Sequence, residues 1–289
     1  MTDSEPSGEK RDGVRASVPK RRLDGPRRPE PWTAAVPRPW LVTEVWLVFA
    51  LSLGAAGVRA AISLIAAVTS GVPLDEQAAV LNASLAPGRP WLDLVLQLTG
   101  LAFALVPVLL AGHFLARSGE GWAPLGLDGA QPRSDLTRGM VLAALIGGTG
   151  LAFYLGVHAA GVNLTVVAEA LPAVWWRVPV LVLSAAQNAV LEEVLVAGYL
   201  LHRLRQLGWR DGRALALSAV LRGSYHLYQG AGGFVGNVVL GLVFGRLYQR
   251  WGRVTPLIVA HTLIDSVAFI GYAYLVGHVS WLPQRPHHR

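Results

Sequence analysis

VWWRVPVLVLSAAQNAVLEEVLVAGYLLHRL, residues 174–204, is the stretch that decides the fold. It is longer than the roughly 20 residues that an α-helix needs to cross a bilayer. Two adjacent glutamates, Glu192 and Glu193, stand inside this apolar run. A charged side chain within a spanning helix costs about 2.5 to 3.5 kcal/mol on insertion scales, so it requires a partner or a task. The stretch therefore predicts a transmembrane helix that carries a functional pair of carboxylates.

The rest of the chain has the composition of a membrane protein. Of its 289 residues, 53% are hydrophobic and 15% are charged, which is more apolar than a water-soluble domain usually is. The predicted fold class is all-α, a polytopic transmembrane helical bundle of about seven spans. The predicted spans are 41–68, 91–115, 136–159, 174–204, 212–228, 234–251 and 254–276. The segment 164–173 is predicted to be a short interfacial or re-entrant piece, and counting it would give eight spans.

The N-terminal region differs in composition from the predicted bundle. Residues 1–40 are rich in Pro, Arg, Glu, Ser and Gly, and they are predicted to form a disordered basic tail without signal-peptide cleavage. The bundle then occupies 41–278, and a short tail 279–289 follows. Because arginines recur in alternate loops, we expect a multi-pass protein of the cell membrane with a cytoplasmic N terminus. The formal charge of +7 then reflects membrane orientation, and no nucleic acid is expected as a partner.

Three further predicted helices also carry polar residues. Arg222 and His226 are four residues apart, as are His261 and Asp265, so each pair lies on one face of its helix. Asn237 lies on the helix between them. Counted at 1.5 Å per residue from the arginines that border the apolar runs, these residues and the two glutamates fall roughly 12 to 20 Å deep. Their shared depth predicts one proton-active site near the middle of the membrane.

The order and spacing of these residues resemble the CPBP family of intramembrane proteases. This family includes CAAX-processing endopeptidases and bacterial relatives linked to bacteriocin processing or self-immunity. Its motifs are Glu-Glu-x-x-x-Arg, Phe-x-x-x-His and His-x-x-x-Asn or Asp, carried by a bundle of about eight helices. The similar region is about 174–268. Two positions depart from the pattern, because Ala197 stands where the family has arginine and Arg222 where it has phenylalanine.

The resemblance implies a role for each matching residue. Glu192 would be the general base that activates a water molecule, and His226 would assist it. His261 and Asp265 would help to hold the oxyanion or the water. Glu193 would be a supporting carboxylate.

The two departures from the motifs are expected to be linked. Arg222 faces the same chamber from the next helix, so we expect it to restore the positive charge lost at Ala197 and to tune the carboxylate pair. Asn237 is expected to be a second supporting residue.

Three functional hypotheses follow. The leading one is an intramembrane endopeptidase that hydrolyses a membrane-embedded or membrane-proximal peptide with a glutamate-activated water and no cofactor. The first alternative is a zinc protease that uses His226, His261 and a carboxylate as ligands, although the chain lacks His-Glu-x-x-His. The second is a non-catalytic scaffold, immunity protein or proton-coupled transporter. The chain has no cysteine, which excludes a cysteine nucleophile and thiolate metal sites.

Overall fold

The computed structural model describes residues 1–2 and 36–283. Contacts divide the chain into Met1–Pro31 and Trp32–Arg289, and the helical bundle belongs to the second unit. Most of the predicted disordered tail, residues 3–35, lies outside the described residues, as does 284–289 of the predicted C-terminal tail. The predicted domain boundaries therefore stay predictions.

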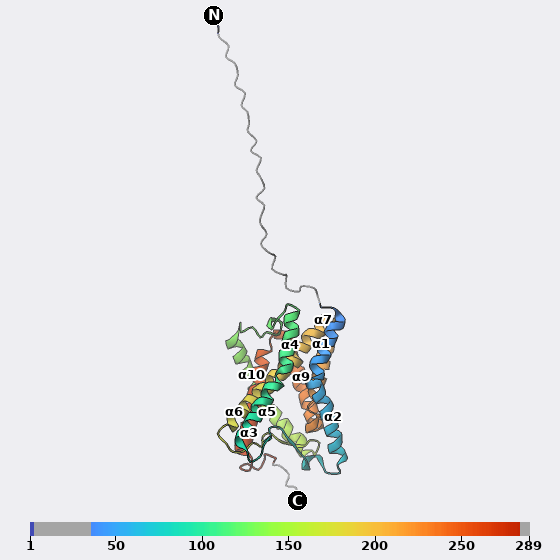
Figure 1. Ribbon diagram of the computed structural model, residues 1–289. Helices are drawn as coiled ribbons and strands as arrows, with labels where there is room; N and C mark the ends of the chain where they lie inside the picture. Colours follow the sequence, from blue (N-terminus) through green and yellow to red (C-terminus); the bar gives the residue numbers. More distant parts are fainter. Residues whose placement is uncertain (3–35, 284–289) are drawn as a thin grey trace. The chain divides into compact units, whose positions relative to one another are not determined.

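The helices of the bundle follow the predicted apolar runs (Figure 1). The longer ones are α1 (Arg38–Ala50), α2 (Leu53–Thr69), α3 (Pro90–Ala104), α4 (Val106–Arg117), α5 (Pro132–Ala159), α6 (Arg177–Glu192), α8 (Asp211–Ser224), α9 (Ala231–Trp251) and α10 (Thr255–Leu275). The shorter ones are the 3₁₀ turns η1 (Leu74–Glu76), η2 (Ala123–Leu125) and η4 (Leu227–Gln229), the π-helix η3 (Glu193–Leu200) and α7 (Leu201–Gln206). Pro132 and Pro256 stand in first helical turns, where a missing N–H costs no hydrogen bond.

Within the described part of the chain, five helical segments are long and apolar enough to cross a membrane. They are Pro90–Arg117, Pro132–Ala159, Arg177–Gln206, Ala231–Trp251 and Thr255–Leu275. A sixth is obtained if α1 and α2, which meet at an angle of 48°, count as one broken span. The predicted all-α membrane bundle is confirmed, and six of the predicted runs coincide with these segments.

The predicted run 212–228 forms a shorter helix than the others. α8 has 14 residues, about 21 Å at 1.5 Å per residue, and the turn η4 follows it closely. At one end of the bundle, Asp211, the first residue of α8, forms an ion pair with Arg205. The N–H of Leu164 donates to the carbonyl of Gln229, the last residue of η4, at the other end. The chain thus passes between the two ends here, but its helix stops part-way.

The connections between helices gather at these two ends. One of them, the arginine-rich end, contains the end of α4, helix α7 and the α9–α10 connection, with Arg117, Arg203, Arg205 and Arg253. At the opposite end, β1 (Ala78–Val80) pairs in parallel with β2 (Thr165–Val167). The segment 164–173 therefore forms a strand in a two-stranded ladder and not an eighth span. The predicted alternation of loops agrees with this arrangement, and the in–out orientation stays a prediction.

Two apolar clusters fill the bundle and leave a polar layer between them. The first contains Val194 to Leu201 on the helix of the two glutamates, together with Leu257 and Ala260 of α10. The second contains residues of α6 up to Ala185, and Phe269 of α10. Glu192 and His261 lie in the interval on these two helices. Along both helices, the polar residues therefore lie between buried residues of the first cluster and buried residues of the second.

Candidate active site

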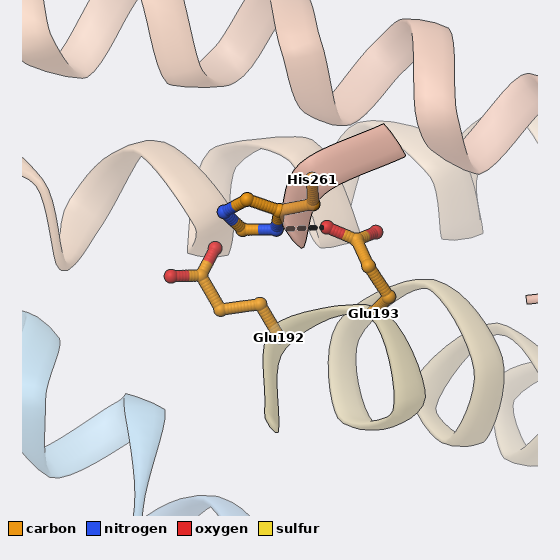
Figure 2. A group of neighbouring side chains, drawn as sticks. All are labelled: Glu192, Glu193 and His261. Carbon is orange, nitrogen blue, oxygen red and sulfur yellow. Dashed lines mark hydrogen bonds and ion pairs between the residues drawn. The ribbon is translucent and has the colours of Figure 1, made fainter. Parts of the chain in front are cut away.

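A change of helix type places the two glutamates at the start of the site. Glu192 is the last residue of α6, and Glu193 is the first residue of the π-helix η3. All eight residues of η3 are buried, so the helix is held by packing on every side. π-Helical turns are rare and occur often at functional sites. Figure 2 shows the two carboxylates on opposite sides of the His261 ring.

Glu193 is a fully buried carboxylate that contacts two ionisable side chains. One of its oxygens, Oε1, accepts a hydrogen bond from Nη1 of Arg222 at 2.7 Å and lies 2.8 Å from Nδ1 of His261. Its side chain is 0% exposed, and that of Arg222 is 1% exposed. Two fully buried charges are tolerated only when they are paired. Glu193 and Arg222 therefore form the buried ion pair of the polar layer.

Glu192 is the more accessible carboxylate. Its side chain is 11% exposed, against 0% for Glu193. Its Oε2 accepts a hydrogen bond from the hydroxyl of Tyr225 at 3.0 Å and forms an ion pair with Nη2 of Arg222 at 3.2 Å. Its Oε1 lies 4.0 Å from Nε2 of His226, a gap that one water molecule can bridge. One oxygen of Glu192 is thus held, and the other faces a histidine across a water-sized gap.

The two histidines use their ring nitrogens differently. Nδ1 of His226 lies 3.0 Å from the carbonyl oxygen of Arg222. A carbonyl only accepts, so Nδ1 carries the proton, and in the neutral ring Nε2 is free to accept. Nδ1 of His261 faces Glu193, and its Nε2 lies 3.4 Å from Oδ2 of Asp265. His261 therefore stands between two carboxylates, with the looser contact on the Asp265 side.

Glycines make room for the arginine of the site. A Cβ at Gly241 of α9 would lie 2.9 Å from Cα of Ala219 and 3.2 Å from Cδ of Arg222. A Cβ at Gly223 would lie 2.6 Å from a methyl group of Val238. Because neither glycine has a side chain, α8 and α9 approach closely, and the guanidinium of Arg222 reaches the carboxylates.

The structure unites most of the residues predicted from sequence, but not all of them. The two glutamates, Arg222, the two histidines and Asp265 form one connected group. Asn237 instead donates its side-chain amide to the carbonyl of Gly233 in its own helix at 3.0 Å. Tyr225 belongs to the group but was not predicted. The only sequence signal for it was its position directly before His226.

A metal ion would compete with Arg222 for the same ligands. Among the described residues, Glu192, Glu193 and His261 offer ligand atoms that all lie within 4.8 Å of one another. His226, which the zinc alternative requires, is not in this set. The guanidinium of Arg222 contacts both of these carboxylates, so a positive charge already neutralises the oxygens that would bind the ion. These residues therefore fit a zinc ion poorly.

The comparisons with known proteins agree with the predicted family resemblance. Residues 174–267 match the family model described as type II CAAX prenyl endopeptidase, Rce1-like. No curated protein matches the chain, and no solved structure does. The match supports an intramembrane protease, and with the candidate spans it indicates a multi-pass membrane protein. The predicted likeness to CPBP proteases is thus confirmed for the segment 174–267, which carries every residue of the connected group.

Proposed function

We propose that this protein is an intramembrane endopeptidase in which Glu192 is the general base. The observation that carries the proposal is the contrast between the two neighbouring carboxylates. Glu193 is fully buried and bound to Arg222 and His261, whereas Glu192 is partly accessible. A base must reach the proton that it removes. Glu192 meets this condition and Glu193 does not.

The proposed reaction begins with a water molecule between Oε1 of Glu192 and Nε2 of His226. Glu192 takes one proton from this water, and the hydroxide oxygen attacks the carbonyl carbon of the scissile peptide bond. In the doubly protonated ring of His261, Nδ1–H faces Glu193, and Nε2–H exchanges its long contact with Asp265 for a hydrogen bond to the resulting oxyanion. The proton on Glu192 then passes to the leaving amine, and the C–N bond breaks. The products are a carboxylic acid and an amine, which together hold both protons of the consumed water, and no cofactor is required.

Arg222 and Glu193 act on the charge of this site without touching the substrate. Arg222 contacts both carboxylates, so it offsets the repulsion between two negative charges in a layer of low polarity. It supplies the charge that the family's arginine would bring at Ala197. We propose that the variant motifs remain catalytic because Arg222 provides the positive charge that is missing at Ala197.

The proposed partners are a peptide within or beside the membrane and the bilayer itself. The matched family is described as a prenyl endopeptidase of CAAX sequences, so a farnesylated peptide with a CAAX terminus is the first probe to try. The residues of the site bind a peptide carbonyl and a water, and they do not themselves recognise a prenyl group. The search for substrates should therefore cover all membrane peptides and not prenylated ones alone.

Comparison of peptide termini in membranes tests the proposal. Host cells that produce the wild-type protein, Glu192→Gln or Glu76→Gln are compared at equal amounts of folded protein. Glu76→Gln is the matched control, because it makes the same chemical change at an exposed position of η1. We expect new termini with the wild type and the control that are absent with Glu192→Gln. Identical termini in all three samples would favour the non-catalytic alternative.

A further inference from the structure

Tyr225 is a buried tyrosine that the predicted mechanism does not use. Its residue is 6% exposed, and it is the first residue after the end of α8 at Ser224. Its hydroxyl donates to Oε2 of Glu192 at 3.0 Å. Its ring lies 4.8 Å from the ring of His226, between centroids. It therefore contacts both residues that flank the proposed water.

We infer that Tyr225 is a positioning residue that determines which oxygen of Glu192 acts as the base. This inference rests on the proposed function. Oε2 receives the hydroxyl of Tyr225 and lies beside the guanidinium of Arg222. Oε1 has neither contact, and it faces His226 at 4.0 Å. An oxygen that already accepts a hydrogen bond and an ion pair is a weaker base than its neighbour, so the geometry selects Oε1.

Arg222 cannot make this selection alone. A guanidinium binds a carboxylate most strongly through two parallel N–H groups, one to each oxygen. The terminal torsion of a glutamate rotates readily, so without another donor Glu192 could turn both oxygens toward Arg222. Arg222 would then neutralise both oxygens of Glu192, and neither would be a good base. The hydroxyl of Tyr225 prevents this by holding Oε2 from a second direction.

The break in α8 explains why the tyrosine reaches this position. His226 donates its backbone N–H to the carbonyl of Gly223, and its Nδ1 contacts the carbonyl of Arg222. The chain therefore turns immediately after the helix, and Tyr225 and His226 stand side by side toward Glu192. A helix that continued would point these two neighbours about 100° apart.

The test is kinetic and compares Tyr225→Phe with Tyr248→Phe. Tyr248 is buried to the same degree, at 7% exposure, and donates its hydroxyl to the carbonyl of Pro124 at the arginine-rich end. Both variants lose one buried hydrogen bond. With a substrate found by terminus comparison, we expect kcat to fall roughly ten- to hundredfold in Tyr225→Phe, with KM and thermal midpoint as in Tyr248→Phe. Tyr248→Phe should keep the wild-type kcat.

A second variant tests the reason for the effect. Lysine cannot bind both oxygens of a carboxylate side by side, so in an Arg222→Lys background the loss caused by Tyr225→Phe should shrink to a few-fold. A merely structural role would give the same loss in both backgrounds. Equal kcat in Tyr225→Phe and Tyr248→Phe would overturn the inference while Glu192→Gln still abolishes cleavage. If Glu192→Gln and the wild type are indistinguishable, both the proposed function and this inference fail.

Discussion

Two regions of this bundle bury a glutamate beside an arginine, and they differ in the partners of the two carboxylate oxygens. At the arginine-rich end, Glu44 of α1 is 2% exposed and pairs through one oxygen with Arg117 and through the other with Arg203. Arg203 is itself fully buried and also contacts Glu120. In the candidate active site, Oε1 of Glu192 has no such partner. In the first region both oxygens of the glutamate face arginines, whereas in the second one oxygen of the partly exposed Glu192 faces a histidine, which leaves it available for the proposed proton transfer.

The strongest test of this comparison removes one carboxylate from each region. Glu192→Gln should lower cleavage by roughly a hundred- to ten-thousandfold, the range that general-base catalysis contributes, and it should leave the thermal midpoint nearly unchanged. Glu44→Gln should leave turnover per folded molecule intact. It should lower stability by about 3 kcal/mol, because it removes the charge of a buried partner of Arg203. Cleavage rates of monodisperse protein and thermal unfolding in detergent measure both effects.

The comparison would break if Glu44→Gln reduced the turnover of folded molecules as much as Glu192→Gln. The arginine-rich end would then take part in the chemistry. Asp75→Asn serves as the control for both measurements, since this exposed residue of η1 has no side-chain ion pair in the described structure.

A second test exchanges the arginine of the site. Arg222→Phe, with Ala197 kept, restores the family's phenylalanine but removes the positive charge from the carboxylate pair. We expect cleavage to fall by about a hundredfold, a loss typical of removing one charged stabilising group. Adding Ala197→Arg should recover part of the activity. The measurement is the cleavage rate of Arg222→Phe, of Ala197→Arg and of the double variant. Unchanged activity in Arg222→Phe would sink the charge-compensation hypothesis.

A smaller effect is expected at the rim of the arginine-rich end. Asp128 accepts from the N–H of Ala130 and pairs with Arg253 at 2.8 Å, and both contacts hold the pKa of Asp128 below its usual value. A depressed pKa in the folded state stabilises the fold above the unfolded pKa of about 3.9, and the benefit is lost as pH falls through the folded pKa. Wild type should therefore melt slightly above Asp128→Asn at pH 7, and this difference in melting temperature should vanish as pH falls through the folded pKa of Asp128. Parallel curves at all pH values would contradict this.

The smallest expected effect is that of metal removal. Because Arg222 occupies the side of the carboxylates that an ion would bind, cleavage by purified protein should be the same with and without a strong chelator. Elemental analysis should give less than one zinc per ten molecules. Loss of activity on chelation, restored by zinc, would favour the metalloprotease alternative and would also require Arg222 to move.

The membrane bundle and most residues of the candidate site could be predicted from local sequence. Long apolar runs predict spans because the bilayer fixes their length. Counting residues from the bordering arginines placed the two glutamates and both histidines at one depth, and the structure joins them in one group. Asn237 shows the limit of such counting, because depth does not say which way a side chain turns. Its amide is satisfied by its own helix.

The remaining features depend on contacts between distant segments. The three-residue strands β1 and β2 are too short to give a periodic pattern, and they form only because two loops meet. Glu44 stands near the start of an apolar run, and only its contacts with the distant Arg117 and Arg203 bring it into the interior. Apart from its position directly before His226, Tyr225 gives no signal, because an aromatic residue in an apolar run is usual in a membrane helix. Its hydroxyl has a partner in the site only because the fold brings Glu192, at the end of α6, beside it.

The early end of α8 has a consequence for the supply of reactant. Hydrolysis consumes one water molecule per bond, and the hydrocarbon interior of a bilayer contains almost none. Between Ser224 and Ala231 the backbone is not α-helical, and backbone of this kind at membrane depth is tolerated only where protein or water satisfies it. Protein satisfies part of this backbone, since the N–H groups of His226 and Gln229 donate to the carbonyls of Gly223 and His226. Under the proposed function, the water consumed beside Glu192 would reach it past this turn, from the end of the bundle where Gln229 contacts Leu164.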